Sequence, residues 1–116
     1  MSSSFKDLLV WQKVHQFIME VYRISKNFPK DEIYGLTSQF RRAAVSIPAN
    51  IAESYTRKGE KDKLRFYNIS QGSLEECRYY IILSNDLGYM KNSEIDKLFE
   101  EISKMLVSYM NKIRQN

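Results

Sequence analysis

The sequence of 116 residues has little of what disulfide-stabilised and all-β proteins need: one cysteine, two prolines and four glycines. A lone cysteine, Cys77, excludes a disulfide within the chain, and a protein of a reducing compartment needs none. So few prolines and glycines do not supply the frequent tight turns of a β-sandwich or barrel. These absences favour an all-helical fold.

Long uncharged runs are absent as well. The first six residues, MSSSFK, lack the apolar core of a secretory signal, and no segment approaches the roughly 20 apolar residues of a membrane span. We therefore expect a cytoplasmic protein without a membrane contact.

Residues for catalysis or metal binding are equally scarce. A di-iron bundle needs two histidines and a Cys/His zinc site needs several ligands, whereas this chain has only His15 and Cys77. The four glycines are isolated, so no phosphate-binding loop is present. Glu75 and Glu76 are adjacent. On a helix their side chains point about 100° apart, so they cannot share a site as an acid/base pair. We expect no catalytic residue, no cofactor and no metal, and therefore a protein that is not an enzyme.

Apolar residues, by contrast, are plentiful. Hydrophobic residues make up 43% and charged residues 28% of the chain, which is enough apolar material for one core. The length is that of an ordinary single domain. We expect residues 1–116 to form one folded, single-domain protein.

The apolar residues recur at steps of three and four in four segments, the spacing of amphipathic helices. We expect a first helix over about 6–27, a second from an N-cap at Thr37 to about 56, a third over 60–87, and a fourth from a cap at Ser93 to about 114. Their short connections predict an up-down-up-down antiparallel four-helix bundle, an all-α fold.

Three residues call for special backbone geometry. Pro48 falls inside the second helix, where the apolar spacing continues, which predicts a kink rather than a break. We expect Asn50 to bond a backbone group freed near this kink, where the carbonyl of Ala44 lacks its usual donor. Gly59 suits a left-handed C-terminal cap. Gly72 inside the third helix costs about 1 kcal/mol relative to alanine, which suggests close approach of another backbone.

The net charge of +4 is concentrated. Between residues 41 and 65 there are seven basic and three acidic residues, and the remainder of the chain is neutral. Such an excess attracts polyanions and anionic surfaces, although a solvated helix-loop-helix corner, with Arg41 or Arg42 in a salt bridge to Glu53 or Glu75, explains it equally well. The candidate nucleic-acid-binding residues are Arg41, Arg42, Arg57, Lys58, Lys61, Lys63 and Arg65.

The first helix has an apolar face wider than one core contact needs. Trp11, Ile18 and Tyr22 widen it, which predicts contacts with another subunit or a partner protein. Trp11 is alternatively a core residue of the bundle. A charged residue at position 11 would separate these alternatives, because it would dissociate an oligomer in the first case and unfold the chain in the second.

The residues of one long segment are more specific than an amphipathic helical pattern requires. Residues 39–53, QFRRAAVSIPANIAE, resemble the signature of the four-helix-bundle proteins encoded by intervening sequences within bacterial 23S ribosomal RNA genes. Shorter matches extend the resemblance over nearly the whole chain: LVWQK at 9–13, FP at 28–29, YGL at 34–36, RF at 65–66, GSLEE at 72–76 and LGY at 87–89. Ser54 stands where many members have glycine, a small-for-small change.

The resemblance implies an antiparallel four-helix bundle that assembles into a ring of five subunits. It also implies kinship with the accessory variability protein of diversity-generating retroelements, which is similar in sequence and works with a reverse transcriptase and nucleic acid. Members of the family are not known as enzymes. Repeating the basic corner at Arg57–Arg65 around a ring would multiply a modest patch into a continuous basic surface.

Two functional hypotheses follow. The first is a non-enzymatic, cytoplasmic homo-oligomer that contacts the phosphates of RNA or another structured nucleic acid at the corner between the second and third helices. The second is a protein-interaction scaffold, for example an accessory subunit of a reverse transcriptase.

Overall fold

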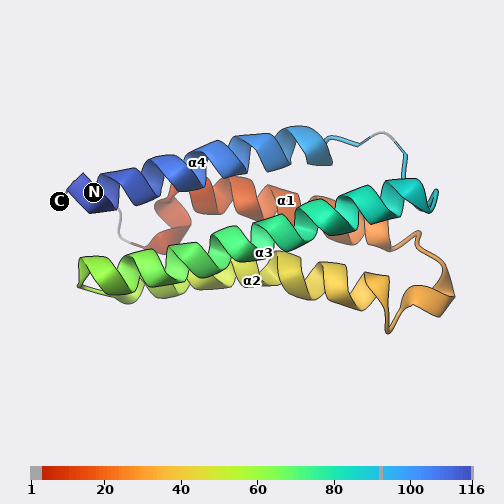
Figure 1. Ribbon diagram of the computed structural model, residues 1–116, viewed down its shortest axis with the longest axis horizontal. Coiled ribbons are helices and arrows are strands. Elements are labelled where there is room, and N and C mark those ends of the chain that lie inside the picture. Colours follow the sequence, from red (N-terminus) through yellow and green to blue (C-terminus); the bar gives the residue numbers. More distant parts are fainter. Residues whose placement is uncertain (1–3, 92, 116) are drawn as a thin grey trace.

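The computed structural model describes residues 4–91 and 93–115, and these residues form four long helices and no strand (Figure 1). This confirms the predicted all-α four-helix bundle. In chain order the elements are the short 3-10 turn η1 (Phe5–Asp7), α1 (Leu9–Ser25), the 3-10 turn η2 (Lys30–Glu32), α2 (Leu36–Thr56), α3 (Glu60–Asp86) and α4 (Ile95–Gln115).

The helices lie along the long axis of a body of 46 × 24 × 22 Å, and the chain reverses at each connection (Figure 1). α1 packs against α2 and α4, while α3 packs against α4 and, most extensively, α2. The start of α1 and the end of α4 therefore lie at the same end of the bundle as the α2–α3 turn (Figure 1). The other end carries the α1–α2 and α3–α4 connections.

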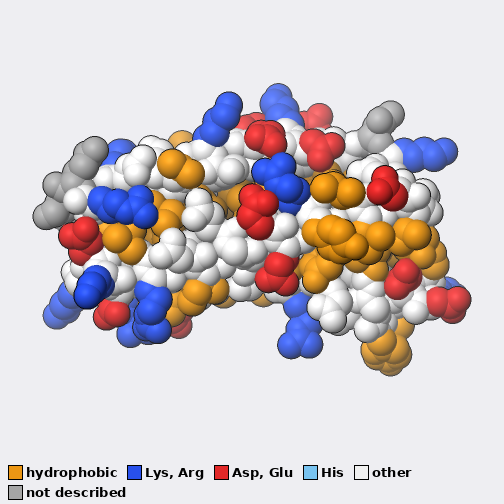
Figure 2. Space-filling model, viewed as in Figure 1, with side chains coloured by type: hydrophobic (Ala, Val, Ile, Leu, Met, Phe, Trp, Pro, Cys, Tyr) orange, Lys and Arg blue, Asp and Glu red, His pale blue; other side chains and the backbone are white. Residues whose placement is uncertain are grey.

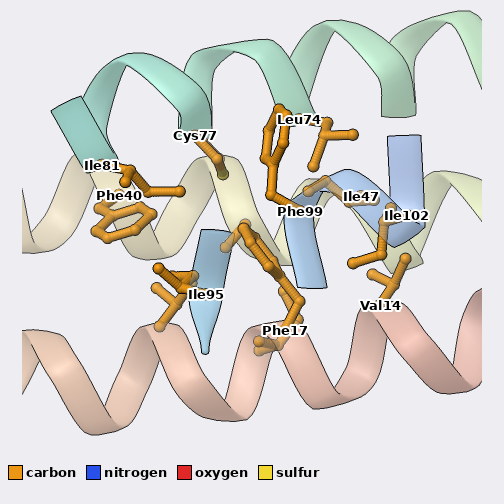
Figure 3. Close-up of a cluster of buried hydrophobic side chains, with 14 of the residues drawn as sticks. Val14, Phe17, Phe40, Ile47, Leu74, Cys77, Ile81, Ile95, Phe99 and Ile102 are labelled. Atoms are coloured by element: carbon orange, nitrogen blue, oxygen red, sulfur yellow. The ribbon is translucent and has the colours of Figure 1, made fainter. Parts of the chain in front are cut away.

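The core is built from the predicted stripes. Because side chains three and four residues apart share one face of a helix, each helix turns an apolar row inward. Figure 3 shows buried side chains from all four helices meeting in one cluster: Val14 and Phe17 from α1, Phe40 and Ile47 from α2, Leu74, Cys77 and Ile81 from α3, and Ile95, Phe99 and Ile102 from α4.

α2 continues through Pro48 as one helix, as expected from the unbroken apolar spacing. A bend at Pro48 stays a prediction. Asn50 does not bond the Ala44 carbonyl: its Nδ2 donates to the carbonyl oxygen of Ser46 at 2.8 Å and to the Ser46 hydroxyl at 3.1 Å. Asn50 thus bonds one turn back along its own helix, and that part of the prediction is wrong.

Small polar residues join α2 to α3. The Ser73 hydroxyl donates to the Ser46 hydroxyl at 2.9 Å, and the Ser70 hydroxyl donates to the Ile47 carbonyl at 2.8 Å. Serine side chains are short, so they let the two helices approach closely while each buried hydroxyl keeps a hydrogen-bond partner. The extensive packing between α2 and α3 follows from this.

The α2 N-terminus differs from the prediction. The helix begins at Leu36, and its amide donates to Oε1 of Glu32 at 3.2 Å, so a side chain from η2 caps it and Thr37 lies buried inside. The Tyr89 hydroxyl donates to Oε2 of the same Glu32 at 2.9 Å. Glu32 therefore holds the α1–α2 and α3–α4 connections together.

Two glycines also differ from the prediction. Gly88, at φ 76°, ends α3 in the left-handed region. Gly59 is extended, at φ −85° and ψ 147°, and directly precedes α3, so it is no left-handed cap. Gly72 is exposed, and no atom lies within 4 Å of the position a Cβ would take, so no other backbone approaches it closely.

Replacing Gly72 with alanine should therefore raise the free energy of unfolding by about 0.5–1 kcal/mol, because alanine loses less conformational entropy in a helix and meets open space here. Urea denaturation followed by circular dichroism measures this. The same change at Gly88 should lower the stability, because alanine is strained at positive φ. A destabilised Gly72→Ala variant would mean that the glycine has a role that its surroundings do not explain.

Candidate nucleic-acid interface

The α2–α3 corner is held rigidly by hydrogen bonds. The Ser54 hydroxyl donates to the Lys63 carbonyl at 3.0 Å, and Nζ of Lys63 donates in return to the Ser54 carbonyl at 3.3 Å. Ser54 is buried, so this reciprocal pair fixes the end of α2 against the start of α3. The side chains of the intervening turn consequently project from a fixed frame.

Two arginines at this corner share one aromatic ring. The Arg57 and Arg65 guanidinium carbons lie 4.7 and 4.6 Å from the centroid of the Phe66 ring. Arg57 also pairs with Glu53 at 3.0 Å, and Arg65 lies 3.9 Å from Asp62. Such exposed ion pairs are weak and leave the guanidinium groups able to contact a further anion. The ring and carboxylates orient both arginines.

The lysines of the corner are less engaged. Lys58 and Lys61 are exposed, and neither forms an ion pair with any residue of ranges 4–91 and 93–115. They are therefore open to contact with an anion.

The fold adds cations that the sequence reasoning missed. A cavity lined by Leu8, Lys58, Lys63, Tyr109 and Ile113 shows that the α2–α3 corner adjoins the start of α1 and the end of α4. Residues 4–10, 53–65 and 108–115 make up this end of the bundle, which we call the basic end. Besides the corner, it contains Lys6, Lys112 and Arg114. The signal for them was the antiparallel topology, which places the last turn of α4 beside the α2–α3 turn.

The basic end accounts for the whole net charge. It holds eight basic and four acidic side chains, while the other charged residues are ten basic and ten acidic. Figure 2 shows lysine and arginine side chains gathered around this end, at the left of the view. A rod with its net charge of +4 at one end presents a directional field to a polyanion.

Arg41 and Arg42 lie elsewhere. They precede Arg57 on α2 by about four turns, or roughly 24 Å along the axis. Nε of Arg41 donates to the Ser25 hydroxyl at 2.8 Å, and its guanidinium lies 4.6 Å from the Tyr22 ring centroid, so Arg41 links α2 to α1. Arg42 is exposed beside Glu76. The seven predicted residues thus do not form one patch.

The predicted salt bridge from Arg41 or Arg42 to Glu53 or Glu75 is also wrong, because both carboxylates pair with other arginines. Glu53 pairs with Arg57 at 3.0 Å, and Glu75 pairs with Arg78 at 3.0 Å. Each carboxylate takes a basic residue three or four positions away on its own helix, the nearest neighbour on a helical surface.

The three predicted interface residues on α1 differ in exposure. Ile18 is 9% exposed and belongs to the core of its own chain, so it offers little surface to a partner. Trp11 is partly buried between Phe5 and His15, with ring centroids 5.3 Å away on both sides. Tyr22 is 42% exposed beneath Arg41. Only part of this face is accessible in the single chain.

The single cysteine and the single histidine both pack against neighbouring side chains. Cys77 is fully buried, and burial raises the pKa of its thiol to about 12, so it carries no thiolate at neutral pH. His15 stacks on Trp11. Within ranges 4–91 and 93–115, no group of three or more His, Cys, Asp or Glu residues is placed to hold a metal ion.

The helices are not membrane spans. Over the residues that the structure describes, none of them combines the length and the apolar character that crossing a bilayer requires.

Comparisons with known proteins bear on the fold and the family. The chain is similar to a crystal structure of a protein with unknown function from the S23 ribosomal protein family of Bacteroides thetaiotaomicron: the TM-score is 0.78 at 23% sequence identity, over 88% of this chain and 98% of that one. This likeness shows the fold. No curated protein matches. Residues 6–108 match the family model described as 23S rRNA-intervening sequence protein, and the chain therefore belongs to this family.

Proposed function

We propose that the protein binds RNA through phosphate contacts at its basic end, without catalysis, as a cytoplasmic homo-oligomer. The observation that carries the proposal is the location of the entire net charge of +4 at one end of the rod, where Lys58 and Lys61 form no ion pair with any residue that the structure describes. Phosphate oxygens are the natural partners of such cations, and these contacts position a nucleic acid without reading its sequence.

The arginines of the corner add geometry to this charge. Arg57 and Arg65 both contact the Phe66 ring, which limits their freedom before any ligand binds. A guanidinium group donates two parallel hydrogen bonds to a phosphate. Less rotamer entropy is lost on binding when the side chain is already ordered, so these two arginines favour phosphate contact more than free ones would.

The ring of five subunits implied by the resemblance belongs to this proposal. Five copies of the basic end would present their phosphate contacts together, so a weak single contact would become tight through avidity. Trp11 and Tyr22 are the predicted α1 residues that retain accessible surface for such an assembly.

The test is a salt series. Anisotropy of a fluorescently labelled RNA hairpin measures the affinity between about 50 and 200 mM salt, and four phosphate contacts should weaken it about 10²-fold over this range. A second hairpin of unrelated sequence should give the same slope. An affinity independent of salt would overturn the phosphate mechanism.

A protein-interaction scaffold is the second candidate, because the other end of the bundle exposes large apolar side chains between its charged ones. Ile33, Tyr34 and Leu87 are exposed there, Tyr34 at 93%, and Figure 2 shows hydrophobic side chains gathered at the right of the view. Exposed apolar patches of this kind mark protein contacts. Binding of a purified reverse transcriptase that persists after nuclease treatment and at high salt would favour this candidate over RNA binding.

A further inference from the structure

The basic end also contains a cavity of about 400 Å³, formed where the end of α2, the start of α3 and the end of α4 meet. Its lining includes three tyrosines, Tyr55, Tyr67 and Tyr109, together with Lys58, Lys63 and Glu60. The volume falls within the range of small-ligand sites, as does the combination of an aromatic wall with a few polar groups.

Tyr67 gives the cavity a polar group whose hydrogen-bonding capacity no described residue uses. It is only 4% exposed, and its ring stacks on Tyr109 at 6.5 Å between centroids and 16° between planes. The hydroxyl is neutral at pH 7, as in an ordinary tyrosine, and burial raises its pKa further, so it can donate a hydrogen bond. Over ranges 4–91 and 93–115, no residue forms a hydrogen bond with this hydroxyl. A ligand in the cavity can therefore bond it.

The charges of the lining favour an anionic group. Lys63 is positioned by its bond to the Ser54 carbonyl, and Lys58 has no ion pair among the described residues. Glu60 offsets one of these two charges, which leaves the lining at +1. A ligand that suits the cavity thus combines a flat aromatic body, a hydrogen-bonding edge and an anionic group.

We infer that the cavity takes one unpaired nucleotide, with its base against the tyrosine rings and the Tyr67 hydroxyl and its phosphate at Lys58 and Lys63. The inference rests on the proposed RNA binding when the nucleotide belongs to an RNA strand, and a free nucleoside monophosphate has the same chemistry. Unpaired bases stack on aromatic side chains, whereas the bases of a duplex are stacked on one another and cannot enter such a cavity.

The first experiment compares two labelled RNAs with equal numbers of phosphates, a hairpin with an unpaired loop and a blunt duplex, by fluorescence anisotropy. The hairpin should bind more tightly. Tyr67→Phe removes only the hydroxyl, and it should weaken hairpin binding about three- to tenfold while leaving duplex binding unchanged. Circular dichroism checks that the variant stays folded. Tyr34→Phe, at the exposed far end, is the matched control and should change neither affinity.

The outcomes separate this inference from the proposed function. Equal binding of both RNAs, with no effect of Tyr67→Phe, would leave the phosphate mechanism standing and overturn the nucleotide cavity. If neither RNA binds, the proposed function fails. An NMR titration with adenosine monophosphate then tests whether the cavity binds a free nucleotide. Shifts of the Tyr67 and Tyr109 ring signals, weakened by Tyr67→Phe and absent with inorganic phosphate, would assign a free-nucleotide site. No shifts would overturn it.

Discussion

Replacing Phe17 with alanine should lower the free energy of unfolding by about 3–5 kcal/mol, the usual cost of removing a buried phenyl ring. Phe17 is fully buried on α1, and Figure 3 shows it in the central cluster together with residues of the other three helices. The ring would leave a cavity that four packed helices cannot close. Because single domains are stable by only about 5–15 kcal/mol, this loss is a large share of the total. Urea denaturation followed by circular dichroism measures it.

The control for this prediction lies on the same helix. Met19→Ala also shortens a large apolar side chain, but Met19 is 62% exposed, so its replacement should change the stability by less than about 0.5 kcal/mol. Equal effects of the two substitutions would mean that Phe17 is not central to the core, or that another subunit covers Met19. The oligomeric state, measured by light scattering for both variants, distinguishes these explanations.

The helices were predictable because their cause is local. The apolar rows of α1 and α4 repeat at steps of three and four, and a helix is the only regular structure that places such a row on one face. The ends were less predictable, because their causes are tertiary. Thr37 has the side chain of an N-cap, yet Glu32 from the preceding turn takes the role, since Tyr89 of another connection holds its carboxylate in place.

The glycines illustrate the same limit. Gly88 ends α3 with positive φ, a conformation that glycine adopts without a steric penalty. Gly72 in a helix interior suggested a close neighbour, but such a neighbour depends on which face the glycine occupies. The hydrophobic row of α3 is interrupted by serines there, so the pattern did not define that face.

The candidate site was predictable in part. Arg57, Lys58 and Lys61 follow one another closely in sequence, so they had to lie at one corner. Arg41 belonged to the same basic segment, but about four helical turns separate it from that corner. Lys112 and Arg114 are distant in sequence and adjoin the corner only because α4 ends beside it. Counting charges along the sequence therefore could not show that Lys112 and Arg114 lie beside this corner.

The cavity was missed for a related reason. Tyr67 stands at a core position of α3, and a tyrosine at that spacing is predicted to pack. It does pack, yet its hydroxyl has no partner among the described residues, and Tyr109 beside it comes from a different helix. The cavity is lined by residues from three helices, and which of them face one another depends on how each helix is rotated about its axis.

Neutralising four cations of the basic end should have the largest effect on RNA binding. The variant changes Lys58, Lys61, Lys112 and Arg114 to glutamine, because none of these is in an ion pair within the described residues, whereas Arg57 and Lys63 also stabilise the corner. Each lost phosphate contact lowers the salt slope by about 1. The affinity at low salt should therefore fall about 10²- to 10³-fold, and the slope should fall by about 4.

The matched control keeps the same change in net charge but moves it to the other end of the bundle. Lys26, Lys30, Lys91 and Lys97 are exposed, and their replacement by glutamine should weaken binding far less, since these residues adjoin the α1–α2 and α3–α4 connections. Equal losses in the two variants would mean that RNA responds to total charge rather than to a site. Because a screened field decays within about 10 Å at 0.1 M salt, a local site on a rod 46 Å long must distinguish its two ends.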